Sequence, residues 1–385
     1  IMGNPPFVGA KFMNDEQRKD VALVFDGIKN SGLLDFVAAW YVKAVRFMKG
    51  ENIRCAFVST NSITQGEQVG VLWRWMLDQG MKIFFAHRTF QWNNEARGKA
   101  AVHCVIIGFA ETDISPKWIF EYENIKGEPH QIKAQNINPY LADAPYFILQ
   151  KRNMPICPVP GMCSGNKPID DGNYLFTPNE KDDFLKKEPQ AEPYFHRWLG
   201  GVEFINNIER YYLWLGECPP NDLKKMPEAL KRVEAVKKFR DSSNSKPTKK
   251  IANTPTRFHT ECIPSSPYLA MPQVSSERRQ FIPISFLHPG PLCGDKLRVI
   301  QNATIYHFGI MNSTMHMAWT RTVTGRLKSD YQYSAGIVYN NFPWPENPTE
   351  KQKQAIEAAA QGVLDARAQF PGSSLADLYD PLTMP

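Results

Sequence analysis

The chain has 385 residues, of which 43% are hydrophobic and 22% are charged, and its formal net charge is +6. This composition is typical of a globular protein of two or three domains, and the apolar runs are too short for a membrane span, which needs ~20 apolar residues. The seven cysteines form no CxxC pair, which argues against a disulfide framework and a zinc site and favours a reducing cytoplasm.

The chain begins at Ile1, without an initiator methionine and without the basic lead and apolar run of a signal peptide, so we interpret it as a fragment. Asn4-Pro5-Pro6-Phe7 follows almost at once. Two consecutive prolines remove two backbone donors and fix two φ angles, so neither a helix nor a sheet ladder can use this corner. The motif leaves an amide on one side of a rigid bend and an aromatic ring on the other.

The next hundred residues alternate helix and strand patterns. Apolar residues at helical spacing predict one helix over Phe36 to Met48 and a second over Gln68 to Gln79. Strands are expected over Arg54 to Val58, Met81 to Ala86 and Val102 to Phe109. This order predicts a mostly parallel sheet that ends in a hairpin. At helical spacing with aliphatic neighbours, Trp40 and Tyr41 are interpreted as core residues.

Beyond about Asn124, prolines become frequent and apolar runs shorten, which indicates a different domain. Between Asp222 and Arg257, eleven Lys or Arg stand against four Asp or Glu, a local excess of seven positive charges. Such a segment fits a phosphate backbone and a solvated helix face equally well. Within it a helix is predicted over Pro227 to Arg240, and a last helix over Glu350 to Ala368. The predicted outward residues of the first of these helices are Lys231, Lys237, Lys238 and Arg240, and the inward ones are Leu230, Val233 and Val236.

The proline corner suits the alkylation of an exocyclic amine on a planar base. Such a nitrogen is a poor nucleophile because its lone pair is delocalised into the ring. Two fixed acceptors, the side-chain oxygen of Asn4 and the carbonyl of Pro5, would favour the pyramidal form that reacts. Phe7 would stack on the face of a base swung out of its duplex. Taken alone, the four residues fit a tight turn equally well.

Asn4-Pro5-Pro6-Phe7 resembles the catalytic motif of adenine-specific DNA methyltransferases. Three later segments resemble the helix, strand and closing hairpin of those enzymes: Leu33 to Gly50, Ala56 to Gln68 and Phe90 to Phe109. The stretches SSERRQFIP, YNNFPWP and LADLYDPLTMP are similar to the C-terminal parts of the MmeI-like (type IIG/IIL) restriction-modification enzymes. The resemblance covers essentially the whole chain.

This resemblance implies an α/β fold with a partial Rossmann-like methyltransferase sheet, a mixed α+β target recognition domain and a helical tail. It places the C-terminal part of the methyltransferase catalytic domain at residues 1–123, the DNA target recognition domain at 124–345 and the C-terminal helical tail at 346–385. The implied function is site-specific adenine methylation of DNA by base flipping, within a fused restriction-modification enzyme of the bacterial cytoplasm. As this fragment, the chain is expected to be inactive.

The resemblance also implies roles for particular residues. Asn4, Pro5 and Phe7 would form the catalytic set, and Phe90 or Trp92 would supply a second aromatic wall for the flipped base. The expected DNA contacts are Arg278, Arg279, Arg321, Arg326, Lys237 and Lys238. An ion pair with the preceding Glu277 is the alternative for the Arg278-Arg279 pair. No metal site is expected, and His87, His103 and His288 are interpreted as structural or surface residues.

S-adenosylmethionine is the methyl donor that the resemblance implies for the parent protein, and double-stranded DNA is the implied substrate. The glycine-rich turn and the acidic residue that usually hold this cofactor do not occur in the chain, so most of the cofactor site is expected in an upstream segment. An endonuclease segment is expected further upstream. Two alternatives remain: a DNA-binding specificity module without its own catalysis, and a methyltransferase that acts on RNA or on protein glutamine.

Overall fold

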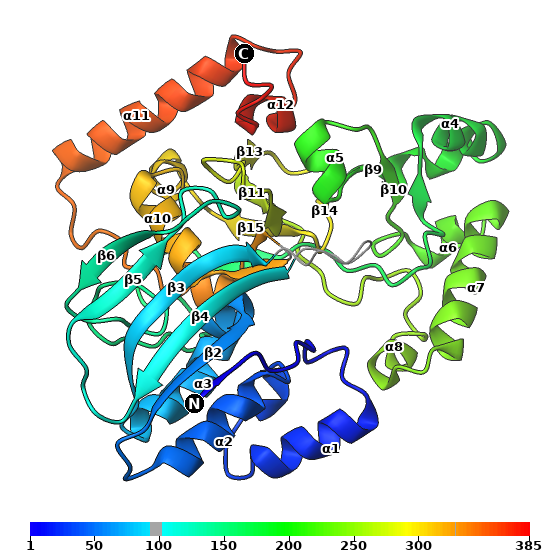
Figure 1. Ribbon diagram of the computed structural model, residues 1–385. Coiled ribbons are helices and arrows are strands. Elements are labelled where there is room, and N and C mark those ends of the chain that lie inside the picture. Colours follow the sequence, from blue (N-terminus) through cyan, green and yellow to red (C-terminus); the bar gives the residue numbers. More distant parts are fainter. Residues whose placement is uncertain (93–101, 328) are drawn as a thin grey trace. The chain divides into compact units, whose positions relative to one another are not determined.

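The computed structural model describes residues 1–92, 102–327 and 329–385. They form two compact units (Figure 1). Unit 1 comprises Ile1–Met154 and Trp319–Asn341, and unit 2 comprises Pro155–Ala318 and Phe342–Pro385. Among the described residues, no helix has both the length and the apolar character that crossing a membrane requires. Both units mix helices with sheets, which confirms the predicted fold class.

Unit 1 is built on a sheet with the strand order β1-β2-β4-β3-β5-β6 (Figure 1). The strands are β1 (Met2–Gly3), β2 (Arg54–Thr60), β3 (Lys82–Trp92), β4 (Val102–Ala110), β5 (Lys117–Glu121) and β6 (His130–Ala134). The predicted strands and the closing hairpin of β3 and β4 are therefore confirmed.

The strand directions in unit 1 correct one expectation. The pairs β1/β2 and β3/β5 are parallel, whereas β4 pairs antiparallel with both β2 and β3, and β6 pairs antiparallel with β5. Four strands therefore share one direction, yet most neighbouring pairs in the described sheet are antiparallel. The prediction of a mostly parallel sheet was wrong because the hairpin return, which must run antiparallel, inserts β4 between two strands that run the same way.

Helices α1 (Asp15–Val24), α2 (Ala38–Met48) and α3 (Gly66–Asp78) complete the first part of unit 1. The last two confirm the predicted helices. Tyr41 on α2 is fully buried, its ring lies 5.3 Å from that of Phe109 on β4, and its hydroxyl is 2.8 Å from Ser59 Oγ. The apolar stripe of α2 thus packs on the sheet, as its helical spacing predicted for Tyr41.

The second segment of unit 1 includes the end of α10 (Thr314–Val323), the antiparallel strands β16 (Gly325–Leu327) and β17 (Asp330–Gln332), and a π-helical turn over Ala335–Tyr339. It packs against the start of α3. Gly66 has φ +57°, and a Cβ atom there would lie 3.3 Å from Gly325 Cα. Only glycine fits both the left-handed backbone and this close approach.

Unit 2 contains two four-stranded sheets, with the orders β14-β9-β10-β8 and β13-β11-β15-β7. Its strands are β7 (Met162–Ser164), β8 (Leu175–Phe176), β9 (Phe195–Leu199), β10 (Tyr211–Leu213), β11 (Tyr268–Pro272), β12 (Val274–Ser275), β13 (Ser285–Leu287), β14 (Leu292–Cys293) and β15 (Leu297–Gln301). Its helices are α4 (Pro178–Lys187), α5 (Gly201–Asn206), α6 (Pro220–Leu223), α7 (Pro227–Ser242), α8 (Lys246–Lys250), α9 (Ile305–Met311), α11 (Glu350–Ala368) and α12 (Leu375–Tyr379). Helices α7 and α11 confirm the two predicted there.

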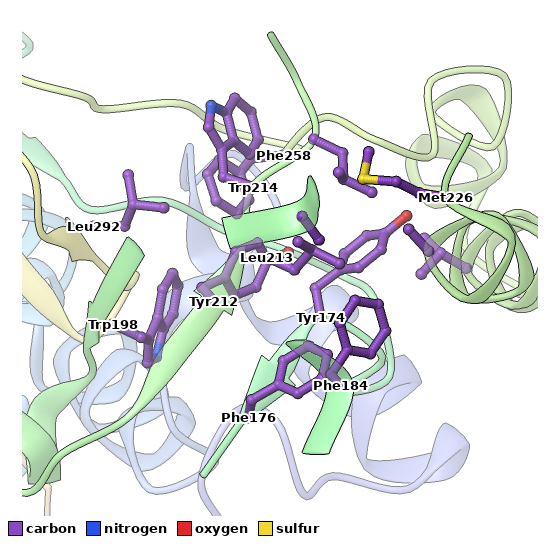
Figure 2. Packing of buried hydrophobic residues seen from close by; sticks show 14 residues of the cluster. Tyr174, Phe176, Phe184, Trp198, Tyr212, Leu213, Trp214, Met226, Phe258 and Leu292 are labelled. Carbon is purple, nitrogen blue, oxygen red and sulfur yellow. The ribbon is translucent and has the colours of Figure 1, made fainter. Parts of the chain in front are cut away.

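An aromatic cluster forms the core around the first of these sheets (Figure 2). Trp214 and Phe258 stack with their ring centroids 4.2 Å apart, and Trp198 stacks on Tyr212 at 5.0 Å. Stacked rings bury large apolar areas and add about 0.5–1.5 kcal/mol per pair beyond that burial. This unit therefore has its own core.

Arg240 on α7 corrects a second expectation. It was predicted to face solvent, but its side chain is only 1% exposed. Its guanidinium donates to five backbone carbonyls at 2.7–3.0 Å, those of Pro168, Ile169, Ile251, Thr254 and Arg257. Helical spacing places Arg240 one turn after the buried Val236, so the position faces inward and a ring of carbonyls replaces water around the charge.

One cysteine pair also departs from expectation. Cys163 on β7 and Cys262, 99 residues apart in sequence, form a disulfide in the structure. The remaining five cysteines are free. The buried Asn166, three residues after Cys163, donates to the carbonyl of Cys262 at 3.2 Å and accepts from its N–H at 2.8 Å. The sequence spacing of the two cysteines gives no sign of this contact.

Candidate active site

The proline corner lies at the carboxyl end of β1. Asn4 and Pro6 are exposed, Pro5 is buried and Phe7 is half-buried. Asn4, Pro5 and Pro6 line a cavity of about 860 Å³, whose other walls include Phe36 and Trp40. The amide that the sequence singled out therefore faces open space, and Trp40, which was interpreted as a core residue, lines the same cavity.

Backbone contacts fix the loop that follows the corner. The N–H of Phe36 donates to the carbonyl of Val8 at 2.9 Å, and the N–H of Ala10 donates to Asp35 Oδ1 at 2.9 Å. The N–H of Phe12 closes the turn by donating to the carbonyl of Gly9 at 2.8 Å. Since the two prolines supply no donors, the rigidity of this segment depends on its contacts with the chain around Asp35.

Asp35 connects the corner to the end of β2. Its Oδ2 accepts a hydrogen bond of 2.5 Å from Ser62 Oγ, which lies 2.8 Å from Thr60 Oγ1. The backbone N–H of Asp35 donates to Gln68 Oε1 on α3 at 3.2 Å. Sequence reasoning missed this residue, because an aspartate just before a helix is also a common start signal and nothing in its spacing points to a site.

Phe90 and Trp92 lie at the same edge of the sheet as the corner. Register pairs Phe90 with Cys104 and Cys104 with Thr60, the last residue of β2. Strand β3 is three strand spacings from β1, which corresponds to ~14 Å. The ring of Phe90 stacks on Tyr122 with centroids 5.3 Å apart, whereas Trp92 is 41% exposed. One face of Phe90 is thus already covered.

His87 on β3 belongs to the same aromatic group. Its ring stacks on Phe120 with centroids 4.2 Å apart, and its Nδ1 lies 2.8 Å from the Tyr122 hydroxyl. Burial lowers the pKa of His87, which favours the neutral ring. Among the described residues, no group of three or more His, Cys, Asp and Glu side chains has a metal-binding arrangement.

The residues expected to contact DNA are divided between the two units. Lys237 and Lys238 are exposed on α7 in unit 2. In the same unit, Arg278 forms an ion pair with Asp380 at 3.0 Å while its side chain stays 60% exposed, and Arg279 is half-buried. The Asp380 side chain is 17% exposed, so Arg278 already has a partly buried partner within the unit.

Arg321 and Arg326 belong to unit 1 instead. The structure brings them together with Arg88 of β3 around a second cavity of about 360 Å³. Sequence reasoning missed Arg88, because a single arginine in a strand of mixed character carries no signal of a shared cavity.

The larger cavity is a candidate site for part of S-adenosylmethionine. Phe36, Trp40 and Phe57 offer aromatic faces of the kind that attract a sulfonium cation, and Asn4 offers an amide beside them. The glycine-rich turn that would hold the rest of the cofactor does not occur in the chain. The residues present therefore fit the reactive end of the molecule.

Comparisons with known proteins agree along the whole chain. The family model of the MmeI DNA-methyltransferase domain matches residues 1–121, that of the MmeI target recognition domain matches 143–346, and that of the MmeI C-terminal domain matches 348–385. The structure of the type IIL restriction-modification enzyme MmeI in complex with DNA is 52% identical with a TM-score of 0.93, covering 100% of this chain and 51% of that chain.

DNA methyltransferase A of Bacillus subtilis (strain 168) is 40% identical over all of this chain, which spans 43% of that protein. This chain thus spans about half, or less, of the length of the relatives it matches.

Proposed function

Because this chain belongs to the MmeI family of restriction-modification enzymes, we propose that it supplies the base pocket and the DNA-recognition part of an adenine-specific DNA methyltransferase. The enzyme would transfer a methyl group from S-adenosylmethionine to the adenine 6-amino group of a specific site in double-stranded DNA, in the bacterial cytoplasm. The observation that carries the proposal is the exposed amide of Asn4, which lines the large cavity on a corner without backbone donors.

In the proposed mechanism, the target adenine leaves the duplex and enters the corner. The side-chain oxygen of Asn4 and the carbonyl of Pro5 accept the two hydrogens of its amino group. These bonds draw the nitrogen toward a pyramidal form and raise its nucleophilicity. Because two prolines fix the backbone of the corner and Asp35 holds the loop that follows it, little conformational freedom is lost when the base arrives.

Stacking holds the extruded base. Phe7, half-buried beside the corner, provides one aromatic face, and Phe90 or Trp92 provides another across the sheet edge. Trp92 has the larger exposed surface, while Phe90 is backed by Tyr122. Stacking between two rings would offset part of the free energy that the base loses when it unstacks from its neighbours.

Bound S-adenosylmethionine supplies an electrophilic methyl group on a sulfonium sulfur. Within this chain, Asn4, Phe36 and Trp40 would line its reactive end.

The test is Asn4→Ala in a form of the enzyme that contains this chain and methylates DNA. Loss of one fixed acceptor should lower kcat by about 10²–10³, by analogy with the removal of a single oxyanion-stabilising group. The affinity for duplex DNA should change by less than about threefold, because one amide carries little of the phosphate-dominated binding. Methylation is measured by transfer of labelled methyl groups, and affinity by fluorescence anisotropy.

Asn52→Ala is the matched control, since Asn52 is exposed and precedes β2 at the opposite end of the sheet. It should leave both quantities unchanged. An equal loss of kcat in Asn4→Ala and Asn52→Ala would contradict the proposal. A filter-binding comparison of duplex DNA, RNA and peptide tests the substrate class: binding of peptide without binding of duplex DNA would rule out DNA as the substrate.

A further inference from the structure

The smaller cavity of unit 1 has features of a second ligand site. It encloses about 360 Å³ beside β3, and we call it the arginine cavity. The lining residues used below are Gln65, Arg88, Glu121, Leu141, Arg321 and Arg326. All of them belong to unit 1.

Charge in the arginine cavity favours an anion. Among the residues that line the cavity are three arginines, Arg88, Arg321 and Arg326, and one carboxylate, that of Glu121. Glu121 forms an ion pair with Arg88 and lies 3.7 Å from His130 Nε2. A cavity with two more cationic than anionic side chains attracts an acceptor-rich group, and planar guanidinium forks match phosphate oxygens.

Arg88 is held by a strained loop. Its Nε donates to the carbonyl of Leu141 at 3.0 Å. Leu141 has φ +59°, a left-handed conformation that is rare for a residue with a branched side chain. The fully buried Asn138 maintains it, because its Oδ1 accepts from two backbone N–H groups of the same loop at 3.0 and 3.2 Å. Backbone strain of this kind concentrates at ligand sites.

Arg326 is also fixed in advance. Its guanidinium lies 4.0 Å from the ring centroid of Tyr331, and its Nη1 donates to the carbonyl of Ser329 at 2.9 Å. Arg88 and Arg326 are therefore oriented by the protein itself, which reduces the entropy lost when an anion binds.

The arginine cavity also contains a neutral acceptor. The side-chain oxygen of Gln65 is buried and has no hydrogen-bond partner among the described residues. A buried amide oxygen without a protein donor can accept a hydrogen bond from a group outside the chain, either water or a ligand. An inorganic anion would leave this oxygen without a donor, whereas a nucleotide carries both a phosphate for the arginines and base N–H groups for Gln65.

The arginine cavity adjoins the aromatic group of the active site. Tyr122 lines it and stacks on Phe90 at 5.3 Å, and Arg88 is two residues before Phe90 on β3. A nucleotide in this position would therefore be a near neighbour of the flipped base along the DNA.

We propose that the arginine cavity binds a nucleotide of the substrate DNA close to the target adenine, with its phosphate on Arg88, Arg321 and Arg326 and a base N–H group on Gln65. This inference rests on the proposed function and deepens it, because it assigns a phosphate clamp to the catalytic unit itself. The clamp would hold the backbone at the point where the base is extruded.

The experiment measures the binding of the chain to duplex DNA as a function of salt. Arg321→Ala should weaken binding by about 3–10-fold at moderate salt and reduce the slope of log K against log salt by ~0.9, the value for one lost phosphate contact. Gln65→Leu should weaken binding by a smaller factor and leave the slope unchanged. Arg74→Ala is the matched control, because Arg74 is exposed on α3 and pairs with Asp78 at 3.4 Å; it should change neither.

Duplexes with a single methylphosphonate then locate the contact. At one position near the target adenine, neutralising the phosphate should weaken wild-type binding but have no further effect on Arg321→Ala. If the losses are additive at every position, or if the Arg321→Ala slope equals that of Arg74→Ala while the wild type binds duplex DNA normally, the clamp is refuted and the proposed function stands. A wild type that does not prefer duplex DNA over RNA refutes the proposed function instead. Thermal melting of each variant checks that it is folded.

Discussion

The proline corner of unit 1 and the turn around Arg240 in unit 2 both gather polar groups, yet they satisfy them in opposite ways. At the corner, Asn4 is exposed beside a large cavity and its loop is fixed from behind through Asp35. Around Arg240, one buried guanidinium meets five carbonyls of its own chain. The first arrangement leaves hydrogen-bonding capacity for a ligand, and the second leaves none.

This difference separates a polar group kept for binding from one kept for folding. The turn next to Arg240 includes Ile169 with φ +50°, an unfavourable conformation for a β-branched residue, and the Ile169 carbonyl accepts from Arg240 Nε at 2.8 Å. Asp170 in the same turn accepts from the Tyr212 hydroxyl at 3.1 Å, so the buried positive charge has a buried carboxylate nearby. The strain at Ile169 is therefore compensated by contacts within unit 2, and we interpret it as structural.

The largest effect is therefore expected from Arg240→Ala. It removes the guanidinium from five carbonyls, of which those of Ile251 and Thr254 also accept from backbone N–H groups. The loss should lower the free energy of unfolding by about 3–5 kcal/mol, as removal of one partner from a buried ionic network does. Urea unfolding followed by tryptophan fluorescence measures the change. The free energy of unfolding of Arg240→Lys should lie between those of the wild type and Arg240→Ala, because one ammonium cannot reach all five carbonyls. A loss below about 1 kcal/mol for Arg240→Ala would contradict a structural role.

Asp35→Asn tests the proline corner. The amide keeps the shape of the side chain but cannot accept from both Ala10 and Ser62 as a carboxylate does. In a methylating form of the enzyme we expect kcat to fall by about 10–100-fold with little change in KM for DNA, because the corner loses orientation and the DNA contacts remain.

Asp35→Glu provides the control for charge, since it keeps the carboxylate at a different reach and should restore only part of the rate. Stability should change far less than in Arg240→Ala. If Asp35→Asn lowers the free energy of unfolding as much as Arg240→Ala does, the Asp35 contacts serve folding. The proposed contrast between the two regions would then be wrong.

Asp35 and Arg240 also show which features could not be predicted from the sequence. The corner itself was predicted from Asn4 to Phe7, because rigidity and acceptor placement are local properties of four residues. Asp35 and Arg240 were missed or misplaced, since their roles depend on carbonyls and hydroxyls that the fold brings from elsewhere in the chain. Likewise, the periodicity of α2 and α7 predicted helices, whereas the insertion of β4 between β2 and β3 follows from tertiary pairing.

Acidification should destabilise unit 2 more than unit 1. His316 is 1% exposed, and burial lowers its pKa to about 4, while the half-buried His87 of unit 1 has a smaller downward shift of its pKa. An unfolded histidine titrates near pH ~6.5. Between that value and the folded pKa the unfolded state binds more protons, so stability is full above pH ~6.5 and falls as the pH drops toward 4.

His316→Gln should flatten this pH dependence, and His87→Phe should change it little. Urea midpoints at pH 7.5 and pH 5.0 measure both. If His87→Phe flattens the curve more than His316→Gln, the polar groups beside the active site contribute more to folding than those of unit 2.

Helix α7 carries both kinds of polar residue, and its exposed lysines give the smallest expected effect. Lys237 and Lys238 lie in the same helix as Arg240 but remain in solvent. If they contact phosphates, each Lys→Ala change should reduce the salt slope of DNA binding by ~0.9 and weaken binding a few-fold, with stability unchanged. Lys186→Ala is the control, because Lys186 on α4 is 74% exposed and already pairs with Asp183 at 2.7 Å. A slope that is the same for all three variants would mean that the excess positive charge of this segment is only a solvated helix face, and that neighbouring residues on one helix serve folding and solubility without serving recognition.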